Sequence, residues 1–179
     1  MRREARTRGH SRGFTLLEIL VVVLIVAIVA TFAVLSIGSR SLEDRLDLEA
    51  RRLDSLIGLA SEEALQQGVD LGFLQTEEGY DFLTLNPATR VWTPVGEGNF
   101  RARTLAEPFY LELRVDGRPV MPRGPRDEGS PLTPQVLILS SGEMTAFDLS
   151  LRARSYAPYY LLQGDLLGRL KLERKADRS

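Results

Sequence analysis

The sequence predicts an α+β fold in which one long N-terminal helix packs on antiparallel β-sheets. Three observations lead to this class. Residues 19–35 form an apolar run without any charge, in which only Thr31 is polar. The apolar residues that follow recur at helical spacing as far as Gly68. Short strand-like segments, separated by turn residues, then fill the remainder of the chain.

Charge is divided unevenly along the 179 residues. The first 13 residues carry five arginines against Glu4 alone, which places the N-terminus in the cytoplasm by the positive-inside rule. The remainder has 18 basic and 23 acidic side chains, a net charge of −5, which argues against general nucleic-acid binding. The absence of cysteine fits an exported domain without disulfides.

The apolar run predicts a membrane-spanning segment at 14–38. A spanning helix needs about 20 mostly apolar residues, and this stretch is long enough with a single charge, Glu18. A cleaved secretory signal is the first alternative, but its apolar part has only about 7–15 residues and ends at a small-residue cleavage site, which Thr31-Phe32-Ala33 matches poorly. A plain signal anchor explains the run and leaves the residues just before it unexplained.

Residues 39–67 are predicted to continue the same helix with a single apolar face. This face is formed by Leu42, Leu46, Ala50, Leu53, Ile57, Ala60 and Ala64. Their spacing of three and four residues puts them on one side, and Gly68 is a natural stop. An apolar stripe of this kind needs a partner surface, which we expect to be a sheet.

A β-rich domain is predicted over 68–179. The expected strands are 69–75, 80–85, 90–95, 100–105, 109–115, 135–140, 145–152, 159–163 and 168–172. Residues 136–139 are apolar on both faces and are expected to form a central strand. Five prolines and three glycines in 116–134 predict a long mobile loop.

A short motif links the leader to the apolar run. Gly13-Phe14-Thr15-Leu16-Leu17-Glu18 resembles the cleavage motif of type IV pilin-like precursors, which include the pseudopilins of type II secretion. The resemblance implies removal of leader 1–13 by prepilin peptidase between Gly13 and Phe14, N-methylation of Phe14, and a role for Glu18 as the assembly carboxylate. It also implies a type IV pilin-like fold.

The position of Glu18 is physically consistent with that role. A carboxylate at the centre of a membrane helix costs about 2.5–3.5 kcal/mol, but the cost falls near the helix end, where the helix dipole is positive. Cleavage would create an amine on Phe14, four residues before Glu18, so the two groups can face each other within one subunit or between neighbouring subunits. The alternative is a glutamate that merely reaches the membrane interface.

Two downstream segments narrow the resemblance. Residues 140–147 and 164–170 look like the paired C-terminal segments of H-class minor pseudopilins, and 64–68 is similar to the helix exit of that class and of FimT-like minor pilins. This implies a subunit of the pseudopilus tip complex that helps export folded proteins across the outer membrane. The subunit would be anchored in the inner membrane, with a periplasmic domain. Its implied partners are the other minor pseudopilins, the major pseudopilin, prepilin peptidase and the inner-membrane assembly platform.

The alternative function is a FimT-like minor pilin of a type IV pilus, which primes assembly or binds DNA for uptake. A basic C-terminal tail, 169–179, with a net charge of +3, could contact phosphates, but the acidic domain and the lack of interleaved aromatic residues favour a solvated tail. Enzyme activity is not expected. The only histidine, His10, lies in the leader, so the mature chain would lack histidine and cysteine, and we expect no catalytic residue, metal site or cofactor.

Overall fold

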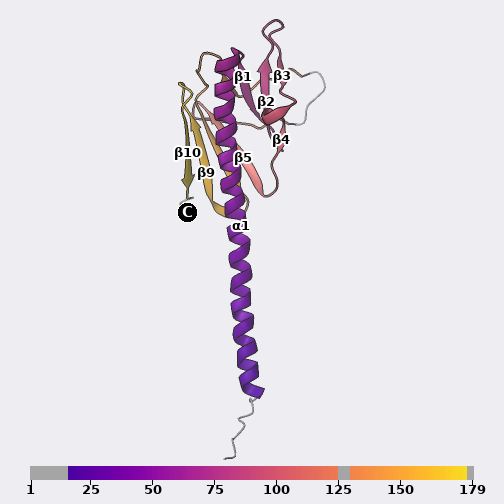
Figure 1. Ribbon diagram of the computed structural model, residues 1–179, viewed down its shortest axis with the longest axis vertical. Coiled ribbons are helices and arrows are strands. Elements are labelled where there is room, and N and C mark those ends of the chain that lie inside the picture. The colour runs from indigo at the N-terminus through magenta and orange to yellow at the C-terminus, as the bar shows by residue number, and fades with distance from the viewer. Residues whose placement is uncertain (1–15, 125–129, 177–179) are drawn as a thin grey trace, which may run out of the picture. The chain divides into compact units, whose positions relative to one another are not determined.

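The computed structural model describes residues 16–124 and 130–176, and the side chains of these residues except 31–41. The chain divides into two compact units, Met1–Leu42 and Glu43–Ser179. A single helix, α1 (Leu16–Gln67), contributes to both units (Figure 1).

In the first unit, α1 exposes apolar side chains on all sides. Exposure ranges from 84% for Leu16 to 43% for Val21, and no described side chain in 16–30 is buried. Within the part of the chain that the structure describes, no helix combines the length and the apolarity needed to cross a membrane.

In the second unit, α1 buries the apolar face that its sequence predicts. The side chains of Leu46, Ala50, Leu53, Ile57, Ala60 and Ala64 are at most 2% exposed. The helix ends at Gly68, whose φ of 67° belongs to the left-handed region that glycine adopts readily. The carbonyl oxygen of Ala64 accepts hydrogen bonds from the N–H groups of both Gly68 and Val69, which closes the helix end.

The first sheet follows the helix directly. It has the order β3-β2-β1-β7, with β4 also paired to β2, and all pairings are antiparallel. Its strands are β1 (Leu71–Gln75), β2 (Gly79–Leu85), β3 (Trp92–Pro94), β4 (Arg103–Thr104) and β7 (Val136–Ile138), with a short 3-10 helix η1 (Gly98–Phe100) between β3 and β4. An aromatic cluster of Phe73, Tyr80, Phe82 and Phe100, with ring centroids 5.2–6.2 Å apart, fills its inner face.

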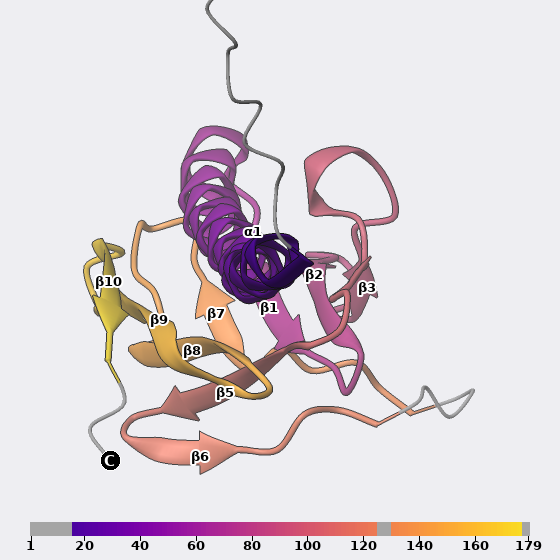
Figure 2. The ribbon, with the colours of Figure 1, turned by 90° about the horizontal axis from the view of Figure 1, so that it is seen from below.

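The second sheet is also antiparallel and has the order β10-β9-β8-β5-β6. Its strands are β5 (Phe109–Val115), β6 (Arg118–Val120), β8 (Phe147–Ala153), β9 (Tyr156–Gly164) and β10 (Leu170–Lys175). In β8 buried residues alternate with partly exposed ones, so Phe147, Leu149, Leu151 and Ala153 form the buried face. Figure 2 shows the two sheets arranged beside the same helix.

The observed fold confirms the predicted class and differs from the prediction at two places. β7 lies at the end of its sheet and pairs only with β1, so the expectation of a central strand at 136–139 was wrong. The side chain of Leu137 is 37% exposed, and the other edge of β7 is closed by the turn that leads to Met144 and Thr145. Within the segment expected to be a loop, Arg118–Val120 form β6 and Arg123 bridges to Thr76.

Candidate functional site

The predicted processing site lies at the edge of the described chain. Gly13 and Phe14 fall outside the described residues, whereas Glu18 is the acidic residue in the first turn of α1. The unpaired N–H groups of a first helical turn favour a negative charge, typically by about 0.3–1 kcal/mol. Glu18 therefore sits in the first described turn of α1, at the end of a helix that tolerates a carboxylate best.

The second half of α1 is held by one tyrosine from each sheet. Tyr160 of β9 donates its hydroxyl to Oδ1 of Asp47 at 2.9 Å, and Tyr80 of β2 donates to Oε1 of Glu49 at 3.3 Å. We call these two contacts the tyrosine clamps. Each clamp joins a different sheet to the helix. Together they therefore oppose both sliding of the helix along its axis and rotation about that axis, relative to the sheets.

The clamps change the titration of the groups that form them. Burial, followed by the Asp47 carboxylate, raises the pKa of Tyr160, and burial followed by the Glu49 charge raises the pKa of Tyr80. Hydrogen bonds from Arg51 and then Tyr160 lower the pKa of Asp47. Both tyrosines are thus held in the neutral form that donates a hydrogen bond, and Asp47 in the charged form that accepts one.

Further contacts hold the start of the second unit. Arg174 of β10 pairs with Glu43 at 2.7 Å. The Arg45 guanidinium lies 5.2 Å from the centroid of the Phe109 ring and donates a hydrogen bond to the Glu107 carbonyl at 3.4 Å. The helix is therefore joined to the β-domain from its first residues in this unit.

The basic C-terminal strand is neutralised by neighbouring carboxylates. Arg169 pairs with Asp165 at 2.7 Å, Lys171 and Lys175 both pair with Glu173, and Arg174 pairs with Glu43. The two lysines lower the pKa of Glu173 to about 2, so its charge persists well into the acid range. In the described part of the tail, each of these cations thus has an acidic partner, which weakens the interpretation of the tail as a phosphate-binding surface.

Of the grooves found among the described residues, a large one lies on the outer face of the second sheet. It has a volume of about 720 Å³ and is open to solvent. In it Arg152 pairs with Glu112 at 2.9 Å, and the Arg152 guanidinium lies 4.0 Å from the centroid of the Tyr159 ring. The groove wall also carries Arg114 and Asp148, and Asp148 accepts a hydrogen bond from the side-chain amide of Gln163 at 2.7 Å. Among the described residues, no three acidic or histidine side chains cluster as metal ligands would.

Comparison with known proteins connects the N-terminal motif to the fold. The prokaryotic N-terminal methylation motif matches residues 8–34. Type II secretion system protein H of Pseudomonas aeruginosa is 38% identical over 148 residues, which cover 80% of this chain and 84% of that protein. The chain belongs to the type II secretion system protein H family. The protein H of Aeromonas hydrophila is 31% identical over 175 residues, covering 92% of this chain and 94% of its own.

Solved structures agree on the fold of this chain. The minor pseudopilin EpsH of the Vibrio cholerae type II secretion system superposes with a TM-score of 0.62, at 23% identity, over 76% of this chain and 99% of that one. A second structure of EpsH gives a TM-score of 0.57 at 24% identity. The relatives named protein H confirm the predicted place of the chain in type II secretion, and they favour it over the pilus alternative.

The tyrosine clamps are functional contacts that sequence reasoning missed. Tyr160 and Asp47 are 113 residues apart, and Tyr80 and Glu49 are 31 apart. The available signal was the position of each tyrosine: both lie on the buried side of a strand that faces an amphipathic helix, where a hydroxyl needs an acceptor.

Proposed function

We propose that this chain is a structural subunit that enters the pseudopilus through α1. The processed helix would present the apolar side chains of 16–30 to the helices of neighbouring subunits, and the β-domain would remain at the periphery. The observation that carries the proposal is the contrast within α1: the described side chains of 16–30 are exposed and almost entirely apolar, whereas the stripe from Leu46 to Ala64 is already covered by the sheets. An exposed apolar surface of that size is typical of an interaction site.

The family and the N-terminal motif together support a proposal for how the precursor is inserted in the membrane and processed. Before assembly, residues 14–38 would anchor the chain in the inner membrane, with leader 1–13 in the cytoplasm and the domain formed by 68–179 in the periplasm. Prepilin peptidase would cut between Gly13 and Phe14 and leave an N-methylated Phe14. The match of the methylation motif to 8–34, which includes Gly13 and Phe14, supports the proposed cleavage and methylation.

The proposed partners are the other minor pseudopilins, the major pseudopilin, prepilin peptidase and the assembly platform. Glu18 would accept a charge-assisted contact from the Phe14 amine of a neighbouring subunit, in an environment with little water and weak screening. The role would be structural, as membership of the type II secretion system protein H family suggests.

Intact-mass measurement on chain purified from membranes tests the processing step. We expect the mass of residues 14–179 plus one methyl group. The Gly13→Leu variant, which removes the small residue at the junction, should keep the full precursor mass. A wild-type chain that starts at Ala33 or later would contradict the proposal and establish an ordinary signal peptide.

A further inference from the structure

Two loops and the end of α1 form one rigid surface in the second unit. Residues 141–144 follow β7, and residues 165–169 join β9 to β10. The N–H of Met144 donates to the carbonyl of Leu166 at 3.2 Å. A β-carbon on Gly168 would lie 2.7 Å from the carbonyl oxygen of Gly142, so the loops touch through their backbones. Gly142 in turn lies against the Leu65 side chain of α1, 3.4 Å from where its β-carbon would be.

The loop at 165–169 is locked by its own hydrogen bonds. Oδ1 of Asp165 accepts the N–H groups of Leu167 at 2.9 Å and of Arg169 at 3.0 Å, while Oδ2 pairs with the Arg169 guanidinium. The N–H of Gly168, at φ 72°, donates to the Asp165 carbonyl. A loop fixed in this way loses little conformational entropy when it binds a partner.

This rigid frame points three leucines at solvent. Leu65 is 53% exposed, Leu166 65% and Leu167 68%. We call Leu65, Leu166 and Leu167 the leucine surface. Exposed leucines scattered singly are common, but these three lie on segments that meet at Gly142, so they concentrate exposed apolar surface at one end of the unit. They contribute little to the core, because each of them keeps more than half of its surface in water.

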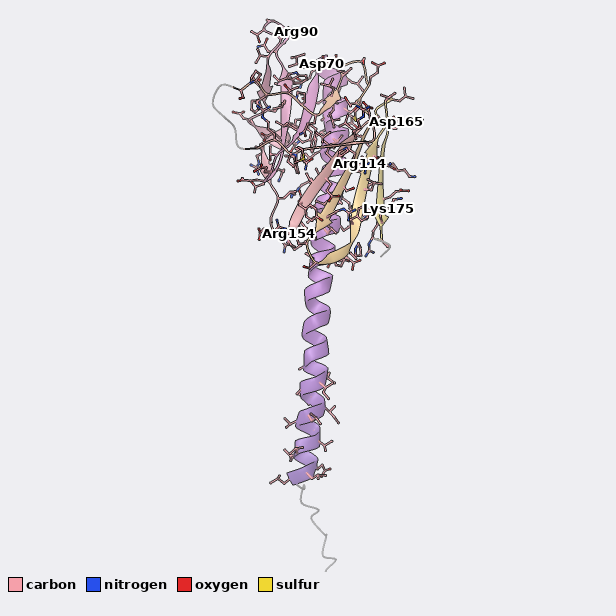
Figure 3. The ribbon with its side chains drawn as sticks, turned by 180° about the vertical axis from the view of Figure 1, so that it is seen from behind. Asp70, Arg90, Arg114, Arg154, Asp165 and Lys175 are labelled. Atoms are coloured by element: carbon pink, nitrogen blue, oxygen red, sulfur yellow. The ribbon has the colours of Figure 1, made fainter. Side chains whose placement is uncertain are left out.

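The surroundings of the leucine surface are acidic. The segments that form it, 61–70, 139–145 and 164–169, contain five carboxylates and one cation: Glu62, Glu63, Asp70, Glu143 and Asp165 against Arg169. Their net charge is −4. The last turn of α1 has no basic residue, so the negative end of its dipole adds to the same field. Figure 3 labels Asp70 and Asp165 toward the end of the domain where α1 finishes, away from Lys175 and Arg154.

We propose that the leucine surface docks an apolar segment, flanked by lysine or arginine, on another pilin-like subunit. The acidic surroundings decide between the occupants. A second copy of this chain would bring two clusters of −4 together, and anionic lipid would be repelled, whereas a basic flank is attracted. Apolar side chains then supply the affinity and the charges supply the selectivity. The inference rests on the proposed function, because it assumes that the chain assembles with pilin-like subunits.

Photo-crosslinking in cells that contain the complete secretion machinery tests this docking. Full-length Leu167→benzoylphenylalanine is compared with Met121→benzoylphenylalanine, because Met121 is 83% exposed and lies outside the leucine surface. We expect position 167 to give at least ten times more adduct with another pilin-like subunit, and the captured peptide to contain apolar and basic residues. Adducts with a second copy of this chain or with lipid, or equal yields at the two positions, would overturn the proposal.

Substitutions within the leucine surface and in its acidic surroundings test the docking, with Met121→Glu as the matched control. Leu166→Glu with Leu167→Glu, and Glu143→Lys, should each lower recovery of the partner at least tenfold, while Met121→Glu should leave it unchanged. Because these side chains are exposed, melting of the purified full chain should not shift. Wild-type recovery with the double glutamate variant would refute the docking surface. Glu18→Val, measured in parallel, tests the proposed function separately. If this variant assembles normally, the proposal that the chain assembles through α1 is refuted, and the docking surface is judged by its own variants.

Discussion

Removing the hydroxyl of Tyr160 tests how much its hydrogen bond to Asp47 stabilises the packing of α1 on the β-domain. In Tyr160→Phe the ring and its packing remain, and only the 2.9 Å hydrogen bond to Asp47 is lost. A hydrogen bond to a charged group is worth about 1.5–3 kcal/mol. Asp47 is partly exposed and keeps Arg51 at 2.9 Å, so we expect a loss at or slightly below the low end of this range, about 1–1.5 kcal/mol.

The second clamp should contribute less. The Tyr80 contact with Glu49 is longer, at 3.3 Å, and Glu49 keeps Arg52 at 3.1 Å, so Tyr80→Phe should cost about 0.5–1 kcal/mol. The two contacts join different sheets to the helix, and we expect their losses to add within about 0.5 kcal/mol in the double variant. The predicted order, in which Tyr160→Phe is the more destabilising, follows from the two distances.

Thermal melting of the purified full chain in detergent measures these losses. At about 3–6 °C per kcal/mol for a domain of this size, Tyr160→Phe should lower the melting temperature by roughly 3–9 °C. Tyr110→Phe is the matched control, because Tyr110 lies on the outer face of the second sheet and is 36% exposed. Melting of Tyr160→Phe at the same temperature as the control would refute the assignment of Tyr160 as a clamp.

The clamps also predict a direction for the pH dependence. The pKa of Tyr160 is raised above its usual value of 10.0, so the folded state holds this proton more tightly than the unfolded state. The stabilisation is therefore complete below pH 10 and is lost as the pH rises above it. Wild-type chain should lose stability in this range more steeply than Tyr160→Phe, and equal slopes would count against the clamp.

Two glycines carry opposite predictions. Gly58→Ala should stabilise the chain by about 0.5–1 kcal/mol, because the new methyl would lie an ordinary 3.7 Å from Leu170 and alanine favours helix; lower chemical stability in a denaturant titration would contradict this. Gly79→Ala should destabilise it by more than about 2 kcal/mol, because the methyl would lie 2.0 Å from the Arg103 carbonyl oxygen where β2 pairs with β4. A wild-type melting temperature for Gly79→Ala would show that this strand pair can separate without cost.

Local pattern predicted most of this fold, because helix and strand periodicity is written in adjacent residues. The stripe from Leu46 to Ala64 follows directly from spacing, as does β5, where Leu111 and Leu113 alternate with charged residues. β6 was not predictable in this way, because it is three residues long, contains Pro119 and lies in a segment rich in turn residues. The edge position of β7 depends on which strand reaches β1, and composition does not record that.

The candidate sites also differ in whether their residues are close together in the sequence. The processing motif and Glu18 are contiguous in sequence and were identified from it. The tyrosine clamps and the leucine surface join segments far apart in the chain, so they became visible only in the fold. The two loops of the leucine surface and their glycines could be recognised in the sequence. The contact between Gly142 and Gly168, which brings the loops together, could not.

Assembly of Glu18→Val in living cells tests the central claim most directly. The variant removes a charge from the apolar segment, so membrane insertion should be easier and cleavage at Gly13 should continue. The account predicts that mature Glu18→Val accumulates in the membrane, fails to co-purify with the other pseudopilins, and does not restore secretion to cells that lack the wild-type chain. Asp44→Val, which removes an exposed carboxylate from the part of α1 in the second unit, should assemble and secrete normally. Normal partner recovery and secretion by Glu18→Val would contradict the account and reduce Glu18 to a tolerated interfacial charge.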